Sequence, residues 1–130
     1  MIYMDASALI TLFTGREGSK ELREFLKERR TVPLATSTIG FVETVRTNGR
    51  HGQVSQLEAE LESAVTELIL TEEIRDKAMY LPGKLKTLDA LHVASALSIA
   101  DYLTVLVSYD RRMLEVADTQ GLPVASPGMN

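Results

Sequence analysis

Short apolar runs alternate along the chain with longer segments in which apolar residues recur every three or four positions. The short runs predict buried strands, whereas the longer periodic segments predict amphipathic helices. The predicted strands cover residues 2–4, 32–35, 66–70, 103–107 and 123–125. The fourth is almost entirely aliphatic, as a strand buried on both faces should be. The fifth contains Pro123, which places it at an edge because proline lacks a backbone N–H to donate.

The predicted helices lie between these runs. They cover residues 6–13, 19–30, 54–64 and 110–120, a segment after the capping residues 36–38, and segments that begin at Thr71 and Thr87. The strongest apolar stripe belongs to the helix after Thr87 and consists of Leu88, Leu91, Val93, Ala94 and Leu97. Helices between successive strands are typical of an α/β fold with parallel strands.

We therefore predict a three-layer α/β/α arrangement around a central, mainly parallel sheet of about five short strands. No stretch has the length and composition of an interdomain linker, so residues 1–130 are expected to form one domain. Ligands of such sheets bind beyond the carboxyl ends of the strands. Functional residues are therefore expected where the strands end.

Composition narrows the chemistry. The 130 residues include no cysteine, which excludes disulfides, thiolate metal ligands and cysteine nucleophiles. The formal net charge of −4 disfavours a protein that binds nucleic acid through overall positive charge. No apolar run approaches the roughly 18 residues of a membrane span, and the N-terminus lacks the pattern of a signal peptide. A cytoplasmic protein without membrane contact is expected.

Four acidic residues occupy positions where a simple structural role does not fully explain them. Asp5 directly follows a buried strand, and Asp110 follows another. Asp89 lies in the first turn of a helix, and Glu43 lies among apolar residues of a second helix. Asp110 could instead serve only as a helix cap. Asp89 could instead serve only as a negative charge that interacts favourably with the helix dipole. Glu43 has the alternative of facing solvent.

A parallel sheet can bring all four carboxylates to one edge. At separations of about 5 Å they repel by about 3 kcal/mol per pair at an effective dielectric constant of about 20, so they must take up protons or bind a cation. An all-oxygen ligand set suits Mg²⁺ or Mn²⁺. Mg²⁺ often completes its shell with water and phosphate oxygens. Metal-assisted hydrolysis of a phosphodiester is the chemistry that this set favours.

Four stretches of the chain resemble the sequence blocks of PIN-domain ribonucleases, most of all the VapC-type toxins of bacterial toxin–antitoxin systems. They are Ile-Tyr-Met-Asp-Ala-Ser-Ala-Leu (2–9), Ser-Thr-Ile-Gly-Phe-Val-Glu-Thr-Val-Arg (37–46), Leu-Asp-Ala-Leu-His-Val-Ala-Ser-Ala-Leu (88–97) and Leu-Val-Ser-Tyr-Asp-Arg-Arg-Met (106–113). They occur in the family's order and at its typical spacing, across nearly the whole chain.

The resemblance implies an endoribonuclease with a catalytic and metal-binding site at Asp5, Glu43, Asp89 and Asp110, in which Mg²⁺, or Mn²⁺ in its place, activates water. It also implies supporting hydroxyls at Ser7 and Ser108, the second at a position where the family usually has threonine. It further implies a tRNA or rRNA loop as substrate, a protein antitoxin as inhibitor, and a homodimer.

Basic and aromatic residues beside these blocks are candidates for substrate contact. The basic candidates are Arg46, Arg50, His51, Arg111 and Arg112. Arg46 lies three residues after Glu43, so an ion pair with that carboxylate is its structural alternative. Tyr109 is a candidate for stacking on a base or for packing. His92, three residues after Asp89, is expected to be a packed or surface residue rather than a ligand.

Other functional classes remain as alternatives. A phosphoacceptor receiver module also places Asp at strand ends and binds Mg²⁺, but it needs an acidic pair after the first strand, where only Asp5 stands. A phosphohydrolase with Asp5 as nucleophile favours a second Asp at the position of Ser7. A nucleotide-binding domain is set aside because the chain has no glycine-rich phosphate loop. A PIN-type domain that binds RNA or a partner without cleavage also remains.

Overall fold

Five parallel strands form the centre of the part of the chain that the structure describes. The computed structural model describes residues 1–49 and 53–129. The strands are β1 (Ile2–Met4), β2 (Leu34–Ser37), β3 (Val65–Leu68), β4 (Val105–Val107) and β5 (Val124–Ala125), in the spatial order β3-β2-β1-β4-β5. The predicted parallel sheet is confirmed, and β5 is an edge strand as its proline indicated.

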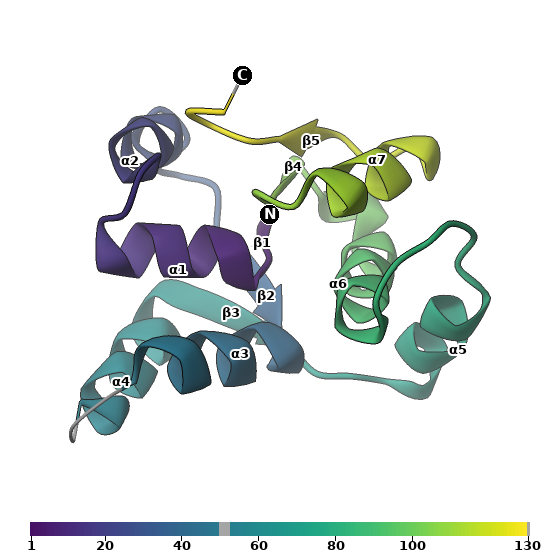
Figure 1. Cartoon of the computed structure of the whole chain (residues 1–130), viewed down its shortest axis with the longest axis horizontal. Helices are drawn as coiled ribbons and strands as arrows, with labels where there is room; N and C mark the ends of the chain where they lie inside the picture. The colour runs from purple at the N-terminus through teal and green to yellow at the C-terminus, as the bar shows by residue number, and fades with distance from the viewer. Residues whose placement is uncertain (50–52, 130) are drawn as a thin grey trace.

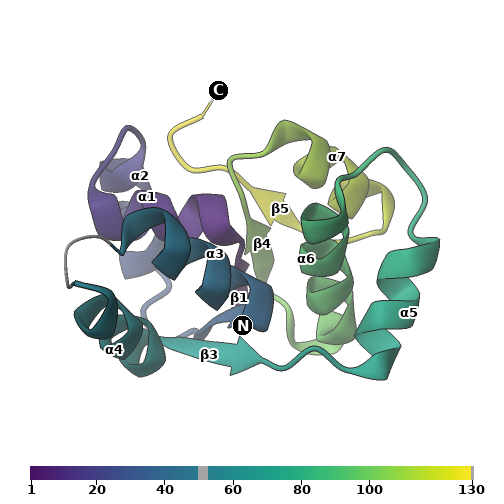
Figure 2. The ribbon, with the colours of Figure 1, turned by 60° about the horizontal axis from the view of Figure 1, so that its bottom comes forward.

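Helices cover both faces of this sheet (Figures 1 and 2). The helices are α1 (Ala6–Thr14), α2 (Ser19–Lys27), α3 (Thr38–Asn48), α4 (Val54–Ala64), α5 (Glu72–Tyr80), α6 (Thr87–Ser98) and α7 (Arg111–Thr119), with a short 3-10 helix at Ala100–Tyr102. Helices α1 to α4 pack on one face, whereas α6 and α7 pack on the other and α5 lies against α6. The three-layer prediction is confirmed.

The alternation of side chains along β1 explains the two layers. Ile2 and Met4 are fully buried in the cluster with α1 to α4, while Tyr3 between them points into the cluster with α6 and α7. Strand β4 alternates in the same way, with Leu106 on the α6 and α7 side. Full burial of an aliphatic side chain of this size contributes about 1.5–3 kcal/mol, so both layers are held by the central strands.

Several element boundaries differ from the predictions. Strand β2 begins at Leu34 rather than at residue 32, and β4 begins at Val105 because the 3-10 helix occupies the chain just before it. The helix predicted for residues 19–30 ends at Lys27. Thr87 is the first residue of α6 and not its cap, since Lys86 occupies the cap position without a side-chain hydrogen bond. Within the described residues, no helix is long and apolar enough to cross a membrane.

The order of the strands reverses direction beside the first strand. From β1 the chain runs outward to β2 and β3 and then returns to the opposite side of β1, where β4 pairs with it. In open parallel sheets this reversal of direction marks the place where ligands bind, beyond the carboxyl ends of the strands. Asp5 follows β1 and Asp110 follows β4, so both aspartates lie where the strand order reverses.

Candidate active site

Asp5 stands at the junction of β1 and α1 and is almost completely buried, with 2% of its surface exposed. Its Oδ1 accepts hydrogen bonds from the Ala8 backbone N–H (2.9 Å) and the Ser7 hydroxyl (2.6 Å). Burial raises the pKa of the Asp5 carboxyl, while nearby His92 and the hydrogen bonds act in the opposite direction. The protein thus encloses a carboxylate that is held in place mainly by hydroxyl and amide donors.

Two serine hydroxyls connect the end of β1 with the end of β4. Ser108 donates its hydroxyl to Asp5 Oδ2 (2.6 Å) and accepts the backbone N–H of Asp110 (3.0 Å). Ser7 accepts the backbone N–H of Tyr109 (2.9 Å). The two predicted supporting hydroxyls therefore contact Asp5 directly and fix the loop that carries Asp110.

Asp110 and Asp89 approach from the layer formed by α6 and α7. Asp110 caps α7 and accepts the Met113 backbone N–H at 3.2 Å. Asp89 lies in the first turn of α6. Burial raises the pKa of Asp89, and the charge of Asp110 raises it further.

The charges of Asp5 and Glu43 also raise the pKa of Asp89, while His92 opposes them. All four predicted acidic residues are therefore close enough to interact electrostatically at one edge of the sheet. Their mutual repulsion is the property that a bound cation would relieve.

Glu43 reaches this edge from α3 and has a partner that the sequence did not indicate. His92 Nε2 lies 2.7 Å from Glu43 Oε1, and His92 Nδ1 lies 2.6 Å from the Tyr3 hydroxyl. His92 is buried, as expected for a packed residue, and it also connects the core to the acidic site. The pattern of the chain gives no signal for this contact, because the partners are 49 and 89 residues away.

The basic candidates differ in what surrounds them. Arg111 and Arg112 are exposed in the first turn of α7, directly after Asp110. Arg46 lines a depression of about 340 Å³ beside Glu43. Arg46 and Glu43 both belong to the described residues, and they form no ion pair with each other. Arg50 and His51 lie outside the described residues.

Tyr109 has a structural contact. Its hydroxyl donates a hydrogen bond to the Pro127 carbonyl at 2.7 Å, which ties the C-terminal segment to the loop between Ser108 and Asp110. This contact agrees with a packing role for Tyr109, which was the alternative to stacking on a base. The hydroxyl of Tyr109 is used in this hydrogen bond.

The donor set of the site fits a hard divalent cation. All four acidic side chains offer oxygen, which Mg²⁺ and Mn²⁺ prefer. Within residues 1–49 and 53–129, no three acidic or histidine side chains are grouped closely enough to form a ready-made metal cage. Mg²⁺ is commonly held by one or two carboxylates together with water and substrate oxygens, so an open arrangement of this kind suits it.

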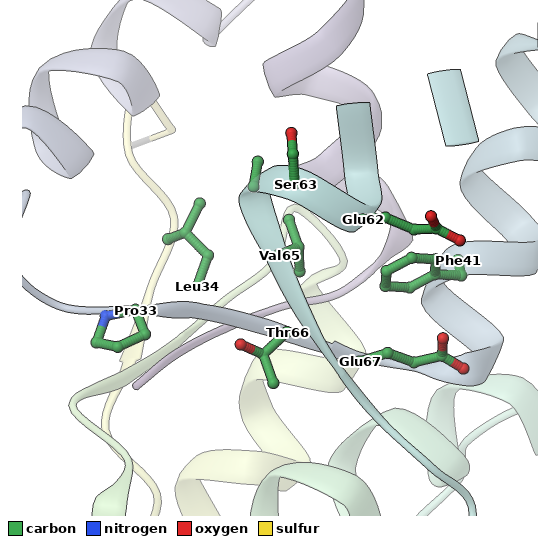
Figure 3. A pocket seen from close by; sticks show the side chains of 9 residues that line it. Pro33, Leu34, Phe41, Glu62, Ser63, Val65, Thr66 and Glu67 are labelled. Carbon is green, nitrogen blue, oxygen red and sulfur yellow. The ribbon is translucent and has the colours of Figure 1, made fainter. Parts of the chain in front are cut away.

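A separate pocket of about 310 Å³ lies at the outer edge of the sheet beside β3 (Figure 3). It contains none of the four acidic residues. Glu62, Glu67 and Phe41 line one side of it, and Glu67 accepts a hydrogen bond from the Thr38 hydroxyl at 2.7 Å. Because its two carboxylates repel phosphate, this pocket does not favour a phosphodiester substrate.

Comparisons with known proteins agree with this geometry. The family model of the PIN domain matches residues 2–119. The chain is 40% identical over 133 residues to Ribonuclease VapC47 of Mycobacterium tuberculosis (strain CDC 1551 / Oshkosh), and the match covers 98% of each protein.

Solved structures show the same fold. The chain is similar to one described as a toxin-antitoxin complex from Klebsiella pneumoniae, with a TM-score of 0.75, 25% identity and 98% coverage of both chains. It is also similar to Mycobacterium tuberculosis VapC20, described as a sarcin-ricin loop cleaving toxin, with a TM-score of 0.73, 17% identity, and coverage of 98% of this chain and 100% of that chain.

The four sequence blocks and the five-stranded parallel sheet thus agree with a match over nearly the whole chain. The chain therefore belongs to the PIN domain family, and its resemblance to the VapC-type members is confirmed.

Proposed function

We propose that this chain is a metal-dependent endoribonuclease and the toxin of a toxin–antitoxin pair. The observation that carries the proposal is the placement of Asp5 and Asp110 at the carboxyl ends of the paired strands β1 and β4, where Ser108 hydrogen-bonds both Asp5 Oδ2 and the Asp110 backbone N–H. A relative named Ribonuclease VapC47, matched over 98% of its length, supports RNA as the substrate. The coupled carboxylates would otherwise be a costly arrangement, which supports a role in binding a cation.

Asp5, Asp89 and Asp110 would hold Mg²⁺, or Mn²⁺ in its place, directly or through water, and Glu43 would complete the shell or orient the attacking water. When bound, such an ion lowers the pKa of a coordinated water and offsets charge on the phosphate oxygens. Ser7 and Ser108 hold the Asp5 carboxylate in one orientation by hydrogen bonds of 2.6 Å each.

The exposed arginines would bind the RNA backbone. Arg46, Arg111 and Arg112 border the site from α3 and α7. Contacts of arginine with phosphate position a nucleic acid without reading its sequence. Arg50 remains a further candidate from the sequence. A tRNA or rRNA loop is the proposed target, in keeping with a similar fold described as a sarcin-ricin loop cleaving toxin and with the accessibility of bases in loops.

A protein antitoxin and a second copy of the chain are the proposed partners, and the cytoplasm is the proposed compartment. Similarity to a chain from a toxin-antitoxin complex supports the antitoxin. Val42 and Leu88 are exposed apolar side chains in the depression beside Glu43. Such side chains offer a protein partner a surface next to the acidic site.

The test is incubation of the purified chain, free of antitoxin, with total cellular RNA in the presence of Mg²⁺, Mn²⁺ or EDTA. We expect discrete cuts with the metal ions, none with EDTA, and none with Asp5→Asn. Asp118→Asn is the matched control, because Asp118 is exposed on α7 and its replacement should leave cleavage unchanged. Absence of cuts under every metal condition would contradict the proposal and favour a PIN-type domain that binds without cleavage.

A further inference from the structure

A line of hydrogen bonds runs from the centre of the sheet to the acidic site. It begins at the Tyr3 hydroxyl, passes through both ring nitrogens of His92 and ends at Glu43 Oε1, with separations of 2.6 and 2.7 Å. Tyr3 is fully buried on β1, and His92 is 1% exposed on α6. The Glu43 side chain on α3 is 28% exposed. The line therefore joins three elements and emerges only at the carboxylate.

The hydrogen-bonding roles of His92 follow from the geometry of this line. An imidazole whose Nδ1 accepts from the Tyr3 hydroxyl carries its proton on Nε2, and an imidazolium carries a proton on both nitrogens, so Nε2 bears a proton in either case. An ionised carboxylate only accepts hydrogen bonds, so the Nε2–H of His92 donates to Glu43 Oε1.

Packing prevents the ring from adopting another orientation. The rings of Tyr3 and His92 meet edge to face, with centroids 5.8 Å apart and planes at 74°. Neither side chain has room to turn towards solvent, because both are buried. By contrast, Glu43 extends from α3 on a flexible stem. A fixed N–H donor therefore sets the direction of a side chain that its own helix does not constrain.

We propose that His92 is a positioning residue that holds Glu43 through Oε1 and leaves Oε2 directed to the reacting centre. This inference rests on the proposed nuclease function, since it explains how the fourth carboxylate of that site is placed. Hydrogen bonds from neighbouring groups are a usual means of orienting carboxylates at metal sites. Tyr3 is the anchor that fixes the orientation of the histidine ring.

The proton arrangement can be observed without catalysis. The chain contains two histidines, His51 and His92, so ¹⁵N spectra of the imidazole nitrogens are assigned by comparison with His51→Gln. We expect His92 to carry a proton on Nε2. An Nε2 without a proton would contradict the inference, whatever the cleavage assay shows.

Variants then separate positioning from general structural support. His92→Phe keeps a ring but removes the donor, and we expect metal-free protein to remain folded while Mn²⁺ affinity and single-turnover cleavage fall by about 10–100-fold. His92→Gln restores an N–H donor and should recover part of both. Tyr3→Phe should give a smaller loss, whereas Tyr102→Phe, at an exposed position, should give none.

A double-mutant cycle gives the decisive comparison. Because His92 is inferred to act through Glu43, His92→Phe should cause little further loss of Mn²⁺ affinity in a Glu43→Gln background. An equal loss in both backgrounds would show a merely structural role and overturn the inference. If the wild-type chain binds Mn²⁺ but cuts no RNA, the proposed function fails, while the ¹⁵N spectra and the binding cycle still decide the role of His92.

Discussion

Asp5 is both a helix cap and a buried charge, and the two roles respond differently to substitution. As a cap it needs one oxygen that accepts the Ala8 N–H. As a charge it is disfavoured by burial, which raises its pKa. Asparagine keeps an accepting oxygen and removes the charge, whereas alanine removes both. The pair of substitutions therefore distinguishes the two contributions.

We expect Asp5→Asn to leave the metal-free protein as stable as the wild type or slightly more stable. Asp5→Ala should be less stable than Asp5→Asn by about 0.5–2 kcal/mol, the usual contribution of a side-chain cap. Thermal or urea unfolding in EDTA measures both. If Asp5→Asn loses as much stability as Asp5→Ala, the hydrogen bonds to the charged carboxylate outweigh its burial.

Helix α6 shows how far a sequence pattern leads and where it stops. Its existence follows from the apolar residues after Thr87, but the face that it buries was only partly predicted. Leu88 belongs to the predicted stripe and is 43% exposed, whereas His92 is buried. A periodicity argument treats histidine as polar and has no means to find its partners, because Tyr3 and Glu43 come from other elements.

The order of the strands in the sheet also lies beyond what local sequence patterns indicate. Each strand was indicated by its own apolar run, three of the acidic candidates by their positions at element ends, and Glu43 by its apolar neighbours. The contacts between β1 and β4 join residues about a hundred positions apart, as Ser108 and Asp5 do. Such contacts depend on tertiary packing, so the sequence indicated them only through the general expectation that a parallel sheet gathers strand ends at one edge and through resemblance to a family.

The approach of α3 to β2 depends on a glycine. A Cβ at Gly40 would lie 1.9 Å from Thr36 Oγ1, although Gly40 has an ordinary helical backbone. We expect Gly40→Ala to destabilise the protein by about 1–3 kcal/mol through overpacking. The double variant Gly40→Ala/Thr36→Ala should recover much of this loss, because the obstructing hydroxyl is removed. Urea unfolding of the two single variants and the double variant tests this, and strict additivity would contradict it.

The acidic site lies between the two layers of the whole molecule. Glu43 comes from the layer that contains α3, and Asp89 and Asp110 come from the layer that contains α6 and α7. Burial raises the pKa of Asp89, and the charges of the other acidic residues raise it further. Protons or a cation at this place should therefore stabilise the folded molecule as a unit.

This coupling predicts a pH dependence of stability with a definite sign. The pKa of Asp89 is raised above its ordinary value of 3.8 in the folded state. Between 3.8 and that raised pKa, the folded state binds more protons than the unfolded state, so its contribution to stability increases as the pH falls through this window. Above the window, Asp89 is charged in both states and its full destabilising effect is present.

In EDTA, Asp89→Asn should therefore be more stable than the wild type at neutral pH, and the difference should shrink as the pH falls through the window. With saturating Mg²⁺ at neutral pH the order should reverse, because the ion stabilises the folded wild type in proportion to its affinity. Urea unfolding across this pH range, with and without Mg²⁺, measures both effects. Asp118→Asn provides the control at an exposed position of α7. A difference between Asp89→Asn and wild type that does not change with pH would contradict the assigned coupling, because unequal proton binding is the only source of the predicted slope.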